Sequence, residues 1–204
     1  AGSLALYAQN ATGYANLMLL SSAAFLENAA VDEPHVPFAR ILQHAEGLIA
    51  FTGGGDGAFT ALLTEGKGDI VDAAVRQLAA AFPNRLYIEL QRHRERSEVD
   101  TEAALVEIAY QHSLPLVATN DIRFEKKTDH APHDALMCIA ASSYLGEEDR
   151  PRVTDEHYFK SAEEMAALFS DLPEAIANAT EVARRCAFRV EKRKPILPRF
   201  DTKK

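Results

Sequence analysis

The chain has 204 residues, of which 47% are apolar and 25% charged, proportions that are ordinary for a globular protein with a sizeable core. Its formal net charge of −8 argues against nonspecific binding of nucleic acid by these residues alone, because phosphate contact requires a basic surface. No apolar run reaches membrane-spanning length, and these residues include no charged-then-apolar stretch of the secretory kind. The two cysteines, Cys138 and Cys186, lie in apolar helical contexts that favour reduced thiols in a cytoplasmic protein. A single disulfide between them is the alternative.

Strand-like and helix-like segments alternate through the first part of the chain. We predict, in order, a strand at 4–9, a helix at about 13–27 capped by Asn10 or Thr12, a short helix ending near 44, a strand at 47–52, helices at about 58–65 and from a cap at Asp69 to 81, a strand at 86–91, a helix at 99–112 and a strand at 115–119. Such short alternation predicts βαβ units and a parallel sheet. Right-handed crossovers would bring the ends of the last three strands to one edge.

The later part of the chain is more helical and more charged. We predict a helix at about 131–143 capped by Thr128 or Asp129, a charged loop at 146–152, a helix opened by the capping box Ser161-Ala-Glu-Glu164, and a helix from Pro173 to about Cys186. The basic, proline-containing stretch at 192–200 is typical of an extended linker. The sequence starts in a strand without an initiating Met, which predicts a piece of a longer polypeptide, although processing or tag removal would leave the same end.

Three apolar strands each run into a polar or glycine-rich loop. The strand at 47–52 leads into Gly53–Gly57, the strand at 86–91 leads into Arg92-His93-Arg94, and the strand at 115–119 ends in Thr119, Asn120, Asp121 and Arg123. In parallel α/β sheets and barrels, ligands and catalytic groups gather at this edge. The pattern therefore places a candidate site at the strand ends.

His93 and Asp121 are the candidate metal ligands at that edge, because imidazole nitrogen and carboxylate oxygen suit a hard or borderline divalent ion. Glu89 could point to the same place or into the core. A surface-loop histidine and an ordinary Asx turn would use the same residues. Two or three ligands do not complete a catalytic centre, so most of any metal site would lie outside this chain.

Other motifs favour structural interpretations. The Gly53–Gly57 loop has neither a Walker ending nor a dinucleotide-binding spacing, and a tight turn with positive φ explains it better. Asp129, His130 and His133 could ligate a metal, but a helix cap with two partly solvated histidines is the simpler interpretation. The sequence contains no Ser-His-Asp elbow, Cys-x-x-Cys pair or His-Glu-x-x-His motif.

Several of these segments, in order, resemble a known family. They are Tyr7-Ala-Gln-Asn-Ala-Thr-Gly-Tyr-Ala-Asn-Leu17, Gly47–Gly57, Leu86–His93, Leu114–Phe124, Ala131-Pro-His-Asp134 and Leu172-Pro-Glu-Ala-Ile-Ala-Asn178. Together they resemble the polymerase-and-histidinol-phosphatase (PHP) domain of bacterial replicative DNA polymerases, the DNA polymerase III alpha subunits. The resemblance covers essentially the whole chain.

The resemblance implies an α/β fold, namely a partial distorted (β/α)7 PHP barrel that lacks its first strands and carries a C-terminal helical segment. Residues 1–145 would be the C-terminal part of the barrel, and 146–204 a helical segment and linker toward the polymerase palm. Missing first strands would leave an open barrel edge, which invites homodimers of the isolated chain.

The resemblance also implies which site residues matter. His93 matches a ligand position of metal-binding PHP members, and Asp121 matches the Asp of a late Asp-x-His pair. Arg123 stands where those members have His, as in proteobacterial polymerases whose PHP site is degenerate. Any binding of Zn, Mn or Mg through His93 and Asp121 would then be vestigial, with no catalytic residue in this segment.

The function implied is that of a structural and docking region in a DNA-templated DNA polymerase. The polymerase palm, with its Mg ions, would lie outside these residues, and the segment alone should not polymerise. Expected partners are the proofreading exonuclease subunit and other replicase subunits, with DNA bound through the parent protein and no membrane. The rival hypothesis is a stand-alone PHP-type phosphoesterase that uses metal-activated water. A pure interaction module is a third.

Overall fold

The computed structural model describes residues 2–29, 31–192 and 194–195, and a four-stranded sheet lies at the centre of this part. The strands are β1 (Ala5–Ala8), β2 (Leu48–Phe51), β3 (Leu86–Leu90) and β4 (Leu116–Ala118), and they lie side by side in chain order. β2, β3 and β4 are parallel, which confirms the expected arrangement of these three strands. β1 differs, because it pairs with β2 in the antiparallel direction.

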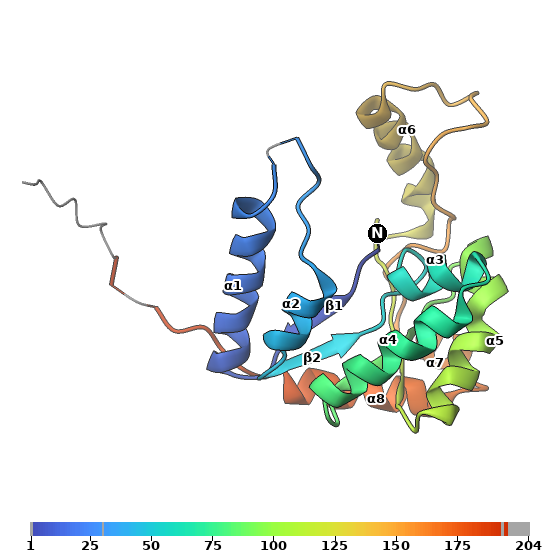
Figure 1. Ribbon diagram of the computed structural model, residues 1–204. Helices are drawn as coiled ribbons and strands as arrows, with labels where there is room; N and C mark the ends of the chain where they lie inside the picture. The colour runs from blue at the N-terminus through green and yellow to red at the C-terminus, as the bar shows by residue number, and fades with distance from the viewer. Residues whose placement is uncertain (1, 30, 193, 196–204) are drawn as a thin grey trace, which may run out of the picture.

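Helices join and cover the strands. They are α1 (Ala11–Leu26), α2 (Phe38–Gln43), α3 (Ala58–Thr64), α4 (Gly68–Ala81), α5 (Arg96–Gln111), α6 (His130–Ala141), α7 (Ala162–Leu168) and α8 (Pro173–Arg185), with a 3-10 turn, η1, at Lys127–Asp129. In Figure 1, α3, α4 and α5 lie together on one side of the molecule, α1 stands at the opposite side, and α6 projects from the body. No helix among the described residues is long and apolar enough to cross a membrane.

One face of the sheet carries the main hydrophobic core. Alternate strand residues such as Leu48, Ile88 and Leu116 point to this face and pack against Val75 and Leu78 of α4, which are fully buried. α4 is helical because its apolar residues recur every three to four positions, so that one stripe faces the sheet. Phe169 and Ala175 from the later part of the chain join the same core. The division of the chain at residues 145 and 146 remains a prediction.

The other face of the sheet has a smaller apolar cluster. Ile49, Phe51, Tyr87 and Val117 form it together with Val182 of α8. The Asn178 side chain of α8 donates a hydrogen bond to the Leu116 carbonyl at 2.8 Å, which fixes α8 against β4. Farther along the strands, this same face becomes polar.

A close contact between two glycines connects β1, α1 and β2. A Cβ on Gly13 would lie 1.9 Å from the Gly47 carbonyl oxygen, so a side chain there would collide with the backbone. Gly47 also has φ +69°, which glycine adopts without strain. The Asn10 side chain accepts a hydrogen bond from Gly13 N at 3.0 Å and is therefore the cap of α1. Asn10 and Gly13 of the Asn10–Tyr14 motif thus bring the start of α1 against the backbone at Gly47.

Most predicted element boundaries agree with the structure to within a few residues, and the differences have local causes. The helix expected to begin at a cap on Asp69 has Lys67 at its N-cap, and Asp69 lies in its first turn. α5 begins three residues earlier than expected, because the Glu98 carboxylate accepts a hydrogen bond from Glu95 N at 3.3 Å. The Asp129 side chain does not cap α6; it accepts a hydrogen bond from Lys126 N.

The later segments confirm two further expectations. The Ser161 hydroxyl accepts from Glu164 N and the Glu164 carboxylate accepts from Ser161 N, so the capping box of α7 is present. Both Cys138 and Cys186 are free. Of the predicted linker, residues 193 and 196–200 lie outside the described part of the chain.

The segment that follows β4 extends the sheet in a way the sequence did not indicate. Phe124 and Tyr158 form an isolated parallel bridge, with Arg123 N donating to the His157 carbonyl at 2.8 Å. The loop at 146–160 therefore returns alongside the end of β4. This return places His157 next to the residues that follow β3 and β4.

Candidate functional site

The carboxyl ends of β2, β3 and β4 meet at one edge of the sheet, as the sequence predicted. A cleft of about 360 Å³ opens there between this edge and the start of the chain. It is lined by Ser3, Leu4, Ala5, Tyr7, Gly53, Gly54, Asp56, Glu89, Gln91, Thr119, Asn120, Asp121 and Arg123. The cleft is thus polar and carries three carboxylates and one guanidinium.

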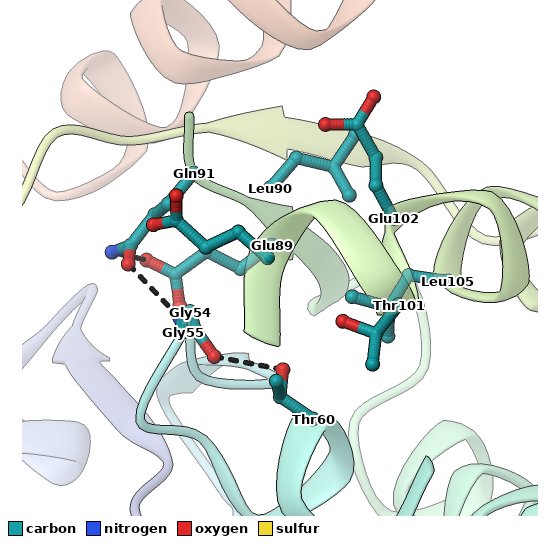
Figure 2. Close-up of a pocket in the computed structure, with 10 residues that line it drawn as sticks. Gly54, Gly55, Thr60, Glu89, Leu90, Gln91, Thr101, Glu102 and Leu105 are labelled. Atoms are coloured by element: carbon teal, nitrogen blue, oxygen red, sulfur yellow. Dashed lines mark hydrogen bonds between the residues drawn. The ribbon is translucent and has the colours of Figure 1, made fainter. Parts of the chain in front are cut away.

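The glycine loop after β2 is a tight turn held by side-chain hydrogen bonds. Gly53 has φ +83°, which confirms the structural interpretation of this loop. Figure 2 shows the Gln91 side chain against the loop, with its Oε1 accepting a hydrogen bond from Gly55 N at 3.1 Å. It also shows Thr60 donating to the Gly54 carbonyl at 2.9 Å. A Cβ on Gly54 would lie 1.9 Å from Gln91 Oε1, so the loop needs glycine for this contact.

Glu89 is a buried carboxyl group on β3 that lines the cleft instead of entering the main core. Its side chain is 5% exposed, and Thr119 Oγ1 donates a hydrogen bond to it at 2.5 Å. Gln91 Nε2 reaches the same Glu89 oxygen at 3.4 Å. Burial raises the pKa of Glu89, and the nearby Asp121 charge adds to this, although these hydrogen bonds act in the opposite direction. Glu89 is therefore a carboxyl group whose environment favours its protonated form.

Asp121 lies at the mouth of the cleft and is paired with Arg123. The Arg123 Nε atom lies 2.7 Å from Asp121 Oδ2, and both side chains are partly exposed. The Asp121 backbone carbonyl contacts His157 Nδ1 at 2.8 Å. The predicted ligand Asp121 therefore lies at the expected edge, and its carboxylate is paired with the Arg123 guanidinium.

His93 is placed differently, because its ring turns away from the cleft and is 1% exposed. Its Nδ1 atom lies 2.7 Å from Glu98 Oε1, and its Nε2 atom lies 2.9 Å from Asn120 Oδ1. Asn120 Nδ2 donates to the Tyr158 carbonyl, which fixes the amide with its oxygen toward His93. Both ring nitrogens of His93 thus face acceptors within the protein.

Two residues that complete this cluster were not predicted. Glu98 accepts hydrogen bonds from the His93 ring and from His93 N, the latter at 2.6 Å. Burial alone would raise the pKa of Glu98, but the bonds and charge of His93 outweigh it and hold that pKa below its ordinary value. His157 stacks on His93, with ring centroids 3.9 Å apart and an interplanar angle of 8°.

The sequence offered only weak signals for Glu98 and His157. Glu98 lies five residues after His93, at the start of a helix, where an acidic residue usually serves the backbone alone. His157 lies 64 positions after His93 in a charged loop. The bridge between Phe124 and Tyr158 and the bond of the Thr154 hydroxyl to the His93 carbonyl bring it near.

The arrangement does not fit a resident metal held by His93 and Asp121. Both His93 nitrogens have protein partners, and the Asp121 carboxylate is paired with Arg123. Among the described residues, no group of three or more His, Cys, Asp or Glu side chains is arranged to hold a metal ion. The edge therefore provides a polar cleft with one buried carboxyl group, Glu89, whose pKa is raised.

The second histidine cluster serves the packing of α6. His130 Nε2 contacts the Val153 carbonyl at 2.9 Å, while the Asp129 side chain is engaged with Lys126 N. The rings of His130 and His133 both pack against Phe124, with centroids 5.9 and 5.3 Å from its ring. The two histidines are half-buried, as the simpler interpretation expected, but its helix cap is wrong, because the Asp129 side chain makes no capping bond to α6.

Arg92, beside His93, connects the end of β3 with the loop between α7 and α8. Its guanidinium donates to both oxygens of Glu102 and of Asp171, at 2.7–2.9 Å, and stacks over Phe169 at 4.5 Å. Hydrogen bonds to Asp171 and Glu102 raise the pKa of Arg92 above its ordinary value. The loop between α7 and α8 is thereby attached to the start of α5.

The comparisons with known proteins, by family model and by sequence, point to the same kind of protein. Residues 1–93 match the family model described as PHP domain. The chain is 50% identical, over 99% of its length, to the DNA polymerase III subunit alpha of Caulobacter vibrioides. It is 39% identical to the proteins of that name from Rickettsia bellii and Pseudomonas aeruginosa, over 97% and 98% of its length. The chain spans 18% of the first of these relatives and 17% of the other two.

Proposed function

Because the chain is homologous to a segment of DNA polymerase III alpha subunits and matches the PHP family over residues 1–93, we propose that it is a PHP segment of a replicative DNA polymerase. The observation that carries this proposal is the 50% identity over 202 residues to one such subunit. The complete polypeptide would copy a DNA template in chromosomal replication. Its polymerase palm, with Mg ions, would lie outside this chain.

The segment itself has a structural and docking role in this proposal. Its sheet would form part of a distorted (β/α)7 barrel in the complete protein. The Arg92 contacts to Glu102 and Asp171 support this role, because they attach α5 and the loop between α7 and α8 to a residue that closely follows the end of β3. A segment tied together in this way suits a scaffold that holds a polymerase core and a partner subunit in a fixed relation.

The strand edge would be a degenerate metal site. Two contacts support this, namely the ion pair between Arg123 and Asp121 and the engagement of His93 with Glu98. A guanidinium at the position of a second ligand repels a divalent ion. We therefore assign no catalytic residue to the chain, and any Zn, Mn or Mg bound through His93 and Asp121 would be vestigial.

The expected partners follow from the same premise. The proofreading exonuclease subunit and other replicase subunits would bind the complete protein in the cytoplasm. DNA would contact other parts of that protein, because this segment has a formal charge of −8. The isolated chain would associate with a second copy.

A stand-alone metal-dependent phosphoesterase is the competing function, and the carboxylates of the cleft are the observation that favours it. The deciding experiment is expression of the complete gene that contains this sequence, followed by two assays of the purified product. The proposal predicts extension of a primed DNA template and no hydrolysis of p-nitrophenyl phosphate with Mn²⁺ or Zn²⁺. A product that hydrolyses the ester, loses this activity on Asp121→Ala and does not extend a primer would overturn it.

A further inference from the structure

The helix α1 has an unusual surface for an outer helix. Its residues, Ala11–Leu26, include no charged side chain, and only Gly13, Leu20 and Ala23 are buried. An outer helix normally carries charged or polar side chains on the side opposite the core. Figure 1 shows α1 at the margin of the described structure, away from α3, α4 and α5. The uncharged side of α1 therefore has no cover among the described residues.

The outward side of α1 carries four large apolar residues, which we call the α1 stripe. Met18, Leu19, Phe25 and Leu26 are 47%, 55%, 69% and 82% exposed. Successive helical residues are turned by roughly 100°, so these four side chains share one side of the helix. Single exposed apolar residues are common on any surface, but a contiguous group of this kind is typical of an interaction site.

The absence of charge on α1 indicates a permanent cover. Surfaces that bind and release a partner are about as polar as the rest of a protein, whereas permanent interfaces resemble a hydrophobic core cut in half. The α1 stripe is of the second kind. Its spacing fits another helix, because intervals of three, four and three residues separate Ala15, Met18, Ser22 and Phe25.

Charge and length favour a segment of the same polypeptide as this cover. Each chain has a formal charge of −8, so two copies would repel each other on approach. A covalently connected segment needs no such encounter and is present at a high effective concentration. The chain spans only 17–18% of the DNA polymerase III alpha subunits it matches, so their length leaves ample polypeptide to supply a helix.

The course of the described chain indicates which part of the polypeptide reaches α1. After α8, the Phe188 ring lies against the Tyr14 ring of α1, with centroids 6.0 Å apart, and Figure 1 shows the chain leaving on this side. At the other end, Ser3 forms a bridge with Gly57 at the edge that holds the cleft. The later part of the chain, and not its start, is thus brought to α1.

We propose that the α1 stripe is the interface for an apolar helix of the same polypeptide that follows residue 204 in the complete protein. This inference rests on the proposed function, in which the polypeptide continues from this segment toward the polymerase palm. It assigns α1 the task of fixing the PHP segment to the part of the protein that carries the palm.

The first measurement uses the complete gene product without any substitution. Hydrogen peroxide oxidises exposed methionines, and Met18 is 47% exposed in the chain, so a bare α1 stripe would let it react within a few fold of added N-acetylmethionine. We expect oxidation of Met18 to be slower than that of N-acetylmethionine by roughly tenfold or more, because a packed helix shields the thioether. Peptide mass spectrometry measures both rates. Fast oxidation of Met18 in the folded protein would overturn the proposal.

The second measurement identifies the cover by photo-cross-linking. The photoreactive residue p-benzoylphenylalanine replaces Leu19 in the complete gene product, and an equal mixture of isotopically light and heavy protein is irradiated. We expect links within one molecule to peptides that follow residue 204. The matched control carries the same photoreactive residue at Asp100, which is 52% exposed on α5, and should not link to those peptides.

Each other outcome of the cross-linking contradicts the proposal. Links between light and heavy molecules would identify a second copy as the cover, and links to peptides that precede residue 1 or to a co-purified subunit would identify another partner. Links from residue 100 to the same peptides would mean nonspecific capture. Primer extension by the same preparation separates the two proposals, because a product that extends primers without the expected link overturns this inference alone.

Discussion

His93 and Asp121 follow neighbouring parallel strands, yet their surroundings are opposite. The His93 side chain is 1% exposed and has a protein partner at each ring nitrogen, whereas the Asp121 side chain is 35% exposed and pairs with Arg123 at the cleft mouth. The difference arises because Glu98, in the first turn of α5, and Asn120 hold the two nitrogens of the His93 ring. Two residues at equivalent strand ends thus belong to separate environments, one that stabilises the fold and one that faces a potential ligand.

The sharpest test of this contrast is His93→Ala. The substitution leaves the buried Glu98 carboxylate without its partner and opens a cavity, so we expect a loss of about 2–4 kcal/mol in the free energy of unfolding. Urea denaturation followed by circular dichroism measures it. Asp121→Asn is the control at the equivalent strand end and should cost less than about 1 kcal/mol. Equal losses for the two variants would remove the distinction.

The pH dependence of stability separates Glu98 from other carboxyl groups. Because its pKa is lowered in the folded state, its contribution is complete above the pKa of the unfolded chain and is lost as the pH falls through the folded pKa. We expect Glu98→Gln to be less stable than wild type by about 1–3 kcal/mol at neutral pH. The difference should shrink on acidification. A difference that does not change between pH 7 and strongly acidic solution would argue against an ionised Glu98 partnered by His93.

Glu89 should show the opposite sign. Its pKa is raised, so its contribution is present at low pH and is lost as the pH rises from the unfolded toward the folded pKa. Glu89→Gln should therefore be as stable as wild type or more stable at neutral pH, with the advantage vanishing in acid. Thermal unfolding across this pH range measures the effect. Destabilisation at neutral pH would show that the ionised form is required in the cleft.

The smallest effect on stability is expected at Arg123. Its ion pair with Asp121 is partly exposed, so Arg123→His should change the free energy of unfolding by less than about 1 kcal/mol. The substitution removes the cation beside Asp121 and supplies an imidazole two residues away. Zn²⁺ affinity measured by calorimetry should rise relative to wild type, and Arg123→Ala should show a smaller rise. No difference among the three proteins would mean that Arg123 does not control metal binding at this edge.

The sequence predicted the elements well because their signals are local. The apolar periodicity of α4, the capping box at Ser161 and the apolar runs of β2 to β4 each determine a short segment on their own. The convergence of strand ends also followed, since parallel strands with right-handed crossovers allow few alternatives. The antiparallel pairing of β1 did not follow from any local pattern.

The candidate site was only partly predictable, because its decisive contacts are not local. Whether His93 faces a cleft or a helix depends on the rotamer that Glu98 imposes, and the stacking of His157 depends on a bridge formed after a long loop. Spacing identified the edge and the position of Asp121. It could not distinguish a ligand from a buried, hydrogen-bonded histidine.

The most direct test of a replicative polymerase with a noncatalytic PHP segment is primer extension by the complete gene product carrying Asp121→Asn. Of the two predicted ligands, Asp121 is the partly exposed one, and this variant removes its charge while keeping the backbone contact to His157. We predict an extension rate within about twofold of wild type, since the interactions removed are not made by the reacting atoms. Loss of extension in a folded variant, or a wild-type product that does not extend primers at all, would contradict the account.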